Sequence, residues 1–514
     1  MSDAHRGTPT PSARRPTLIP SLREYIDALR AIGEAVDVTP EVDWNLEIGA
    51  IIRRCYEIGA PAPLFNHITG IGNGFRVFGA PAGISSQPGL YLSRVALSLG
   101  LDARATGQQI VEALVEAKTR QPRPPRRVAT GPCKEHVLQG DEVDLLQLPT
   151  PLIHAGDGGR YIGTWATIVA RTPDGAWTNW SIARVMLVDE RRMTGIVHPL
   201  QHLGQIHGMW KALGKPMPFA MFQGGPPFIP FVSGMPLPAG VGEADYMGGY
   251  FGEPVDVVRC ETVELDVPAT AEIVVEGYLS DTETAMEGPM GEYAGYLWRG
   301  NGSPKPVYRV TAMTYRDRAI LPVVAAGEPV EEDHTAQGIP SAAQVLTELR
   351  SAGIPATMAW VTLESAQHWL VVTLPRDCRS RLGRTANQIC REIGSILFER
   401  SKYGHNNIPK VLVMNDDVDP TNTLEVVWAL ATRHHPGSSG EVLFGEEFAG
   451  MVAFLRTSEK FTGKTTKVVY NCLPPEDWGD TLPGRSSFAH NYPASLQDRV
   501  LARWQEYGFP DRAR

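Results

Sequence analysis

The spacing of apolar residues changes twice along this chain, and these changes constrain the fold more than any other feature. Before residue 121, apolar residues recur at helical spacing, as in Ser21–Ile32. From about Cys133 to Val324 the period is close to two, which is typical of strands. After Gly327, helical and strand patterns alternate. The sequence therefore predicts an N-terminal α/β region, a barrel-like β domain and a separate C-terminal α/β domain.

Length and local composition place the boundaries of these parts. A chain of 514 residues is expected to form two or three domains. Three prolines in Gln121–Arg127 mark a linker before the β region. The predicted ranges are a disordered tail at 1–18, an N-terminal α/β region at 19–127, the β domain at 128–326, a C-terminal α/β domain at 327–480 and a tail with a short helix at 481–514.

Individual elements follow from the same patterns. The expected helices are Ser21–Ile32, Leu46–Ile58, Leu90–Leu99, Thr106–Arg120, Gln201–Leu213, Glu243–Tyr250, Ser341–Ala352, Ala386–Glu399, Thr423–Thr432 and Ser495–Tyr507. The expected strands are Phe75–Phe78, Tyr161–Arg171, Ser181–Val188, Phe219–Phe222, Val255–Leu265, Ala271–Leu279, Val307–Tyr315, Ala359–Leu363, Trp369–Leu374 and Lys410–Asn415.

Charge and cysteine usage narrow the class of protein. A net charge of −9 argues against nucleic acid as the main partner. The six cysteines are scattered without a CxxC pair, which suits reduced thiols in a cytosol. No apolar run approaches the ~20 residues that span a bilayer. We expect a cytoplasmic protein that binds neither nucleic acid nor membrane.

The stretch Thr178–Arg184 is the first candidate for chemistry. It follows the turn signal Thr172–Gly175 and leads into the apolar run Val185–Val188, so Asn179 and Arg184 are expected where a hairpin loop enters its second strand. An amide and a guanidinium there could hold a phosphate or carboxylate. The same residue types also occur in ordinary hairpins.

A second candidate is Glu287-Gly-Pro-Met-Gly-Glu292, which places two carboxylates across a segment unsuited to a helix. Two neighbouring carboxyl groups can divide the roles of acid and base. The alternative is a surface turn flanked by solvated glutamates.

A third candidate is a metal site. His202 begins a helix, and the loop from Ser233 delivers Glu243 to the start of another helix. With Asn179, these residues form an oxygen/nitrogen/oxygen set that suits Mn²⁺ or Mg²⁺. Taken singly, His202 and Glu243 are also ordinary residues of a first helical turn. Lys402 is either a phosphate contact or a plain surface lysine.

Together these motifs resemble the UbiD family of reversible decarboxylases, nearest its ferulate/cinnamate decarboxylase branch. The resemblance runs in order from about Leu22 to Leu473. It is carried by Thr178–Arg184, Gln201-His202, Ser233–Pro238, Glu243, Glu287–Glu292 and Ser401–His405. It implies an α+β fold with a central split β-barrel that binds prenylated FMN, and a C-terminal oligomerisation domain.

The resemblance also implies a ligand set for the cofactor. Asn179, His202 and Glu243 match the ligands of Mn²⁺ (or Mg²⁺), and Trp180, Ser233, Met235 and Glu243 match positions around K⁺. The remaining residues that match cofactor contacts are Ser181, Ile182, Ala183, Arg184, Gln201, Pro236 and Lys402. The chain differs from close relatives at Tyr293-Ala294 and in Ala326–Pro329, near the expected substrate.

Arg184, Glu287 and Glu292 match the catalytic network of the family. The implied reaction is the non-oxidative decarboxylation of an aromatic, heteroaromatic or α,β-unsaturated aryl acid through a covalent adduct with prenylated FMN. Arg184 would bind the carboxylate, and Glu292 would donate the proton. The implied partners are the acid and CO₂, a flavin prenyltransferase that supplies the cofactor, and a second copy in a homodimer, or five in a hexamer.

Two other interpretations remain open from the residues alone. One is a conventional FMN oxidoreductase or a metal-dependent hydrolase that uses the Asn179/His202/Glu243 site. The other is a non-catalytic module in which the glutamate pair forms a surface turn.

Overall fold

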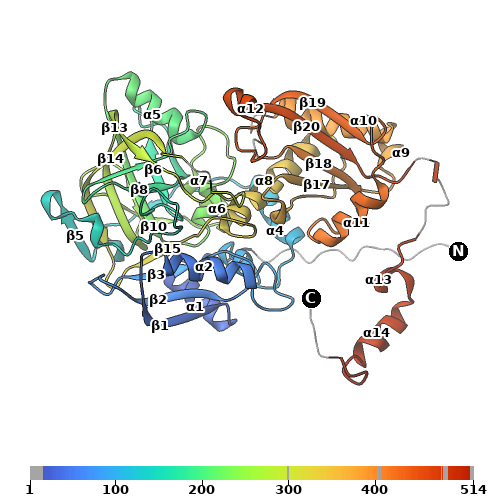
Figure 1. Ribbon diagram of the computed structural model, residues 1–514, viewed down its shortest axis with the longest axis horizontal. Helices are drawn as coiled ribbons and strands as arrows, with labels where there is room; N and C mark the ends of the chain where they lie inside the picture. Colours follow the sequence, from blue (N-terminus) through green and yellow to red (C-terminus); the bar gives the residue numbers. More distant parts are fainter. Residues whose placement is uncertain are drawn as a thin grey trace.

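The computed structural model describes residues 15–297, 300–401, 405, 407–475, 477–478 and 484–509. Within them the chain forms an N-terminal layer, a central curled sheet and a C-terminal sheet (Figure 1). Lys402 lies outside the described residues, as do most of the tail expected at 1–18 and parts of the tail expected at 481–514.

The N-terminal layer is a four-stranded sheet with helices packed against it. Its strand order is β1-β2-β3-β15, and the last strand arrives from far along the chain to pair in parallel with β3. The strands are β1 (Ala35–Val42), β2 (Ala62–Ile68), β3 (Arg76–Gly79) and β15 (Ile320–Val323). Its helices are α1 (Leu22–Ala31), α2 (Glu47–Ile58) and α3 (Ser93–Ser98). The next helix, α4 (Gly107–Ala117), packs against α8 (Glu332–Ser351) instead of this sheet.

Local chemistry explains where these helices begin. Ser21 caps α1 by accepting a hydrogen bond from the backbone N–H of Glu24, and Thr106 and Gln109 form a reciprocal capping box at α4. Helix α3 is held by a buried ion pair, in which Nε of its Arg94 lies 2.7 Å from Oε2 of Glu34.

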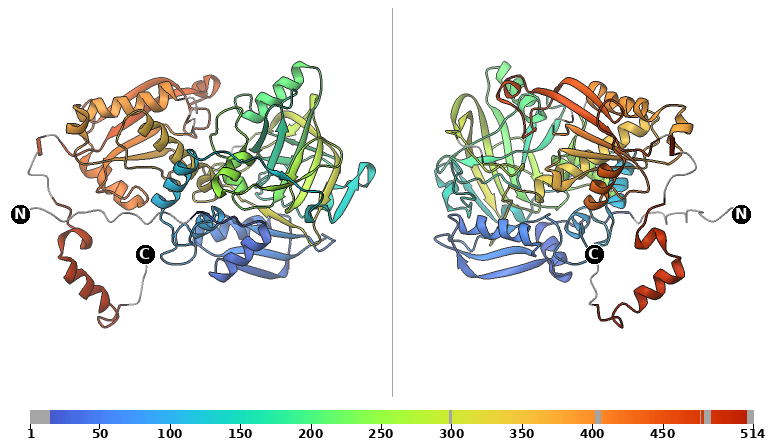
Figure 2. Two further views of the ribbon diagram at one scale, coloured as in Figure 1. Left: turned by 180° about the vertical axis from the view of Figure 1, so that it is seen from behind. Right: turned by 45° about the vertical axis from the view of Figure 1, so that its right-hand side comes forward.

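The central part is an eight-stranded sheet that curls on itself (Figure 2). Its order is β7-β6-β10-β13-β14-β9-β8, with β5 pairing on β14. The strands are β5 (His136–Gln139), β6 (Thr167–Arg171), β7 (Thr178–Ile182), β8 (Val185–Leu187), β9 (Arg192–Gly195), β10 (Met217–Gly224), β13 (Ala271–Glu287) and β14 (Ser303–Tyr315).

The edges of this sheet correct one of the sequence predictions. Ser181–Val188 was predicted as one strand, but β7 and β8 stand at opposite ends of the sheet, and only Ala183 and Arg184 separate them. So short a link spans at most about 10 Å, which requires the sheet to curl until its edges nearly meet. Asn179 therefore lies within β7 instead of a hairpin loop. Arg184 lies where the edge strands β7 and β8 come together, a place called the seam below.

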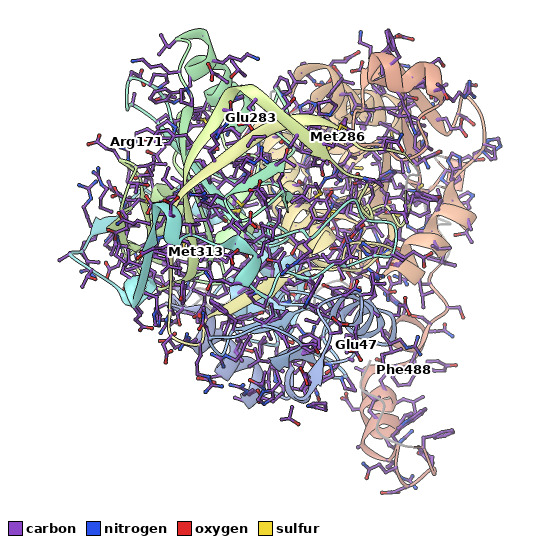
Figure 3. The ribbon with its side chains drawn as sticks, turned by 60° about the vertical axis from the view of Figure 1, so that its left-hand side comes forward. Glu47, Arg171, Glu283, Met286, Met313 and Phe488 are labelled. Carbon is purple, nitrogen blue, oxygen red and sulfur yellow. The ribbon has the colours of Figure 1, made fainter. Side chains whose placement is uncertain are left out.

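Strand β13 is much longer than its apolar run predicts. Its register shifts between Leu279 and Thr284, and it then continues to Glu287. Figure 3 shows the strand bending at Glu283 and continuing past Met286 toward the C-terminal sheet. The bend carries Glu287 out of the sheet's centre to the seam. Periodicity does not reveal this extension, because its side chains are mostly polar or half-exposed.

Short elements complete the central part. A three-stranded sheet of order β12-β11-β4 lies beside it. Its strands are β4 (Arg126–Arg127), β11 (Asp256–Arg259) and β12 (Asp266–Pro268). The other elements are the helices α5 (His202–Ala212), α6 (Ile229–Ser233) and α7 (Glu243–Phe251), and the 3₁₀ turns η1 (Pro132–Lys134), η2 (Gly140–Glu142) and η3 (Leu145–Gln147).

The C-terminal part is a five-stranded sheet of order β16-β17-β18-β20-β19 with helices on both faces. Its strands are β16 (Met358–Val361), β17 (Trp369–Leu374), β18 (Lys410–Asn415), β19 (Glu441–Phe448) and β20 (Lys464–Asn471). Its helices are α8 (Glu332–Ser351), α9 (Cys378–Leu382), α10 (Ala386–Gly394), α11 (Thr423–Arg433) and α12 (Thr457–Thr462), with the short turns η4 (Leu363–Ser365) and η5 (Ser395–Arg400).

Successive side chains of β18 point to opposite faces of the sheet, and each face is covered by different helices. Val411 and Val413 pack in one core with α10, whereas Leu412 and Met414 pack in another with α11. Helix α8 lies between the central and C-terminal parts (Figure 1), and its apolar residues join both in one continuous core. Beyond the sheet, α13 (Phe488–Asn491) and α14 (Ala494–Ala502) stand away from the body and contain no buried residue.

Candidate active site

Arg184 stands at the seam of the central sheet and joins two carboxylates. Its Nε and Nη2 donate to Oε1 and Oε2 of Glu287 at 2.8 and 3.1 Å, and its Nη1 donates to Oε1 of Glu292 at 2.7 Å. The first contact is the planar two-point pairing that a guanidinium favours. Burial alone would lower the pKa of Arg184, but the hydrogen bonds and charges of the two glutamates raise it. The arginine is therefore permanently charged.

The two glutamates differ in exposure and in the number of their contacts. The Glu287 side chain is 1% exposed and also accepts a hydrogen bond from the hydroxyl of Tyr161 at 2.8 Å. The Glu292 side chain is 35% exposed, and it accepts a hydrogen bond from Arg184. Glu287 is thus a fixed anchor for the arginine, whereas Glu292 can exchange a proton with water.

The loop between the two glutamates is in close contact with His154 and Asp157. Gly288 has a φ of +86°, a conformation that glycine adopts without strain. The N–H of Gly291 donates to Oδ1 of Asp157 at 3.0 Å, and a Cβ on Gly291 would lie 2.6 Å from the His154 ring. The glycines therefore allow the close approach that holds this loop. As predicted, the segment is not helical.

A cavity of about 580 Å³ adjoins this network. Most of the residues predicted to contact the cofactor line it, namely Asn179, Ser181, Ile182, Gln201, His202, Ser233, Met235, Pro236 and Glu243. Arg184 lies two residues after Ile182 in the chain. Tyr293, next to Glu292, donates from its hydroxyl to the carbonyl of Met451, which also lines the cavity. The network of Arg184 with the two glutamates therefore adjoins the cavity.

Three of the predicted cofactor contacts, Trp180, Ala183 and Arg184, do not line this cavity. Trp180 is 2% exposed, and its indole packs edge-on against Phe222 in the core. Only its backbone is turned to the site, where its N–H donates to Glu243. Ala183 lies in the two-residue link beside Arg184 and does not line the cavity. The predicted contact of Lys402 falls outside the described residues.

Sequence reasoning missed the residues that arrive from the C-terminal part. Gln337 and Ser341 of α8, with Asn407 and Met451 from loops, complete the wall of the cavity. It also missed Tyr161 and Asp157, which support the glutamates. None carries a local pattern, because each meets the site only through long-range packing.

The predicted metal ligands Asn179, His202 and Glu243 all line the cavity. Glu243 is 3% exposed, and its oxygens accept from Asn179 Nδ2 and Trp180 N, both at 2.7 Å. Burial raises the pKa of Glu243 to about 8. Burial also lowers the pKa of His202, which keeps the ring neutral and able to ligate.

These residues fit a divalent cation. A buried carboxylate without a cationic partner is costly, and a bound metal would remove that cost. Among the described residues there is no cluster of three His, Cys, Asp or Glu side chains suited to a metal, and the predicted set contains only two such residues. Its third member is the amide of Asn179, whose oxygen suits Mn²⁺ or Mg²⁺.

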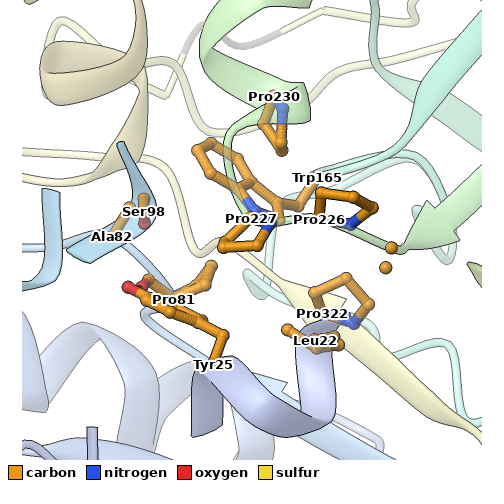
Figure 4. Close-up of a pocket in the computed structure, with 12 residues that line it drawn as sticks. Leu22, Tyr25, Pro81, Ala82, Ser98, Trp165, Pro226, Pro227, Pro230 and Pro322 are labelled. Carbon is orange, nitrogen blue, oxygen red and sulfur yellow. The ribbon is translucent and has the colours of Figure 1, made fainter. Parts of the chain in front are cut away.

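A second cavity, between the N-terminal layer and the central part, is a poor candidate (Figure 4). Its walls are mainly prolines and aromatic rings, including Tyr25, Trp165 and Pro227, and its volume is about 20 Å³. That volume suits a single water molecule, so an organic substrate does not fit.

An arginine held between two carboxylates beside a large cavity has the chemistry needed to bind a carboxylate and to move a proton. Comparisons with known proteins agree. The chain matches the models of the 3-octaprenyl-4-hydroxybenzoate carboxy-lyase N-terminal domain over residues 26–114, its Rift-related domain over 126–329 and its C-terminal domain over 334–472.

Two relatives match nearly the whole chain. It is 45% identical to the pyrrole-2-carboxylic acid decarboxylase of Pseudomonas aeruginosa, over 95% of this chain and 98% of that protein. It is 39% identical to ferulic acid decarboxylase 1 of Saccharomyces cerevisiae, over the same shares.

Solved structures show the same fold. The UbiD-class enzyme HmfF from Pelotomaculum thermopropionicum in complex with FMN matches 94% of this chain and 100% of that chain, with a TM-score of 0.80 and 26% identity. An evolved dimeric form of HmfF in complex with prFMN matches 94% of this chain and 99% of that chain, with a TM-score of 0.76 and 25% identity.

The chain therefore belongs to the UbiD family, as its motifs predict. It is a flavin-dependent decarboxylase with a mixed α and β fold. No helix in the described part of the chain is long and apolar enough to cross a membrane.

Proposed function

We propose that this enzyme reversibly decarboxylates an aromatic, heteroaromatic or α,β-unsaturated aryl acid, with Arg184 binding the carboxylate and Glu292 donating the proton. The observation that carries the proposal is the position of Arg184, fixed by Glu287 and in contact with Glu292 beside a cavity. The substrates in the names of the two relatives, pyrrole-2-carboxylic acid and ferulic acid, support this class of acid.

Arg184 suits the binding of the carboxylate. Three of its five N–H groups donate to the glutamates, so two N–H groups remain for a substrate. The paired contact with Glu287 prevents the guanidinium from turning. The substrate carboxylate would then be held in one orientation, with the bond to be broken in a fixed direction.

Glu292 suits the transfer of the proton. When the bond to the carboxyl carbon breaks, CO₂ leaves and the electron pair stays on the substrate carbon. A proton from the Glu292 carboxyl group completes the product, and water restores that proton, because the side chain is 35% exposed. Glu287 cannot take this role, since its two oxygens are engaged by Arg184 and Tyr161 in a site closed to water.

The flavin is proposed to be prenylated FMN, which supplies the electron sink that no amino-acid side chain provides. Asn179, His202 and Glu243 would hold Mn²⁺ or Mg²⁺ beside its phosphate, and Ser233, Met235, Glu243 and the Trp180 backbone would surround K⁺. Support comes from the buried carboxylate of Glu243 and from the prFMN complex of HmfF. Lys402 stays a proposed phosphate contact.

The partners and location are proposals too. We infer a homodimer built through the C-terminal part, where Leu424 and Trp428 of α11 and residues of α13 and α14 expose apolar surface. A hexamer is the alternative. A flavin prenyltransferase would supply the cofactor. Six free cysteines support a reducing cytoplasm.

The test is to produce the chain with and without a flavin prenyltransferase. The cofactor released from the protein is identified by mass, and CO₂ release is measured over a panel that includes pyrrole-2-carboxylate, ferulate and cinnamate. Prenylated FMN and turnover of one class of acid are expected. Glu292→Gln should abolish turnover and keep the bound flavin, and normal turnover by this variant would refute the role of Glu292.

The same panel separates the competing functions. A requirement for a pyridine nucleotide would indicate a conventional FMN oxidoreductase, and hydrolysed products would indicate a metal-dependent hydrolase. Folded, metal-replete protein that retains no flavin after co-production would contradict the proposed function.

A further inference from the structure

Tyr293, which directly follows Glu292, bonds two separate segments of the C-terminal part. Its carbonyl accepts a hydrogen bond from Nε2 of His334 at the start of α8, at 2.8 Å. Its hydroxyl donates to the carbonyl of Met451 at 2.5 Å. The residue next to the proposed proton donor is therefore attached at both its backbone and its side chain.

The segment that receives the tyrosine hydroxyl is itself firmly held. Ala449, Val452 and Leu455 form a small buried cluster of their own. The N–H of Ala453 donates to Nε2 of His368 at 3.0 Å, while Nδ1 of the same ring bonds the carbonyl of Ala366. Segment 449–455 is thus fixed to the C-terminal sheet, and it brings Met451 to the wall of the cavity.

The loop around Glu292 depends on such outside support. Glu292 and Tyr296 close a tight turn, in which the N–H of Glu292 donates to the carbonyl of Tyr296 at 3.0 Å. On the side of the central sheet, Asp157 bonds Gly291. On the side of the C-terminal part, the contacts of Tyr293 with Met451 and His334 hold the chain.

We propose that Tyr293 is a positioning residue that couples segment 449–455 to Glu292, so that the carboxyl group is in place for proton transfer only while this segment lies against the cavity. The inference rests on the proposed role of Glu292. A displacement of about 1 Å at a reacting group can lower the rate about a hundredfold. The loss of one hydrogen bond beside Glu292 can therefore slow the reaction measurably. Burial raises the pKa of Tyr293, which keeps its hydroxyl a donor at physiological pH.

The experiment compares Tyr293→Phe with Tyr91→Phe. Tyr91 also bonds the C-terminal part, with its hydroxyl donating to Glu364 at 2.7 Å, but it does not line the cavity. Both variants remove one hydroxyl and keep the ring, so Tyr91→Phe controls for the loss of a tyrosine hydrogen bond to this part of the protein.

Two measurements are made on the full chain. Hydrogen–deuterium exchange of peptides covering 287–297 and 449–455 is followed in cofactor-free protein, and kcat and KM are measured in loaded enzyme. For Tyr293→Phe we expect faster exchange in both segments and a kcat about three- to tenfold lower, with KM within twofold of wild type. Tyr91→Phe should match the wild type in these segments and in kcat.

If hydrogen–deuterium exchange at 449–455 is the same in Tyr293→Phe as in the wild type, Tyr293 does not couple this segment to Glu292. Faster exchange with an unchanged kcat would overturn the positioning role. If the wild type shows no decarboxylation at all, the proposed function fails, and the exchange measurements still decide whether Tyr293 couples the two segments.

Discussion

The buried side chain of His334 leads us to predict that the folded protein loses stability in acid. Its side chain is fully buried at the start of α8. Its Nδ1 accepts from the backbone N–H of Glu331 at 3.0 Å, and its Nε2 donates to the carbonyl of Tyr293 at 2.8 Å. The ring is therefore held as the neutral tautomer that carries its proton on Nε2.

The magnitude follows from the pKa of this ring. Burial lowers the pKa of His334 from 6.5 to about 4 in the folded protein. The unfolded chain takes up its proton first as the pH falls. The stability from the neutral ring is therefore complete above about pH 6.5 and is lost progressively toward pH 4. Between pH 7 and pH 5 the loss is about 2 kcal/mol.

The assay is urea unfolding of the wild type and His334→Gln at pH 7 and pH 5. Glutamine keeps an N–H donor for the Tyr293 carbonyl but does not titrate. Burial raises the pKa of the neighbouring Asp333 to about 7, which acts in the opposite direction. Both chains contain Asp333, so their difference isolates His334. At pH 7 the wild type should have a larger free energy of unfolding than His334→Gln. This difference between the two proteins should be about 2 kcal/mol smaller at pH 5. An equal gap at both pH values would refute the reasoning.

Three further predictions test other contacts. Glu34→Gln leaves Arg94 buried without its counter-charge and should lower the free energy of unfolding by about 3–5 kcal/mol, whereas a loss below about 1 kcal/mol, typical of exposed pairs, would contradict it. Tyr161→Phe removes a hydrogen bond to the Glu287 carboxylate and should lower kcat/KM about tenfold, and steady-state rates equal to wild type would count against this support. Glu243→Gln should lose bound divalent metal, measured by elemental analysis after desalting, and a full metal content would exclude Glu243 as a ligand.

Local features of the sequence determined many elements of this fold. Strands β17 and β18 have the predicted bounds, Trp369–Leu374 and Lys410–Asn415, because both are short apolar runs that a proline bounds at one end and a polar residue at the other. The capping residues Ser21 and Thr106 place the starts of α1 and α4 within one residue of the prediction. Elements with weak periodicity, such as β1 and the polar half of β13, were missed, since their burial is partial.

Some residues of the candidate site could likewise be predicted from the sequence, and others could not. The motifs predicted Asn179, His202 and Glu243 as one set, and the structure brings all three to one cavity. The supporting residues Tyr161 and Asp157 belong to no motif. Nor do Gln337 and Met451, which reach the cavity from the C-terminal part.

The sequence by itself determined the kinds of side chain at this site and the family to which the chain belongs. The resemblance already grouped Arg184 with Glu287 and Glu292, but only the tertiary structure decided how Arg184 reaches Glu287, which is 103 residues away: their contact requires the sheet to curl until β7 and β8 nearly meet. That curvature arises from the pairing of distant strands. A periodic pattern reports which face of a strand is buried but not which strand lies beside it.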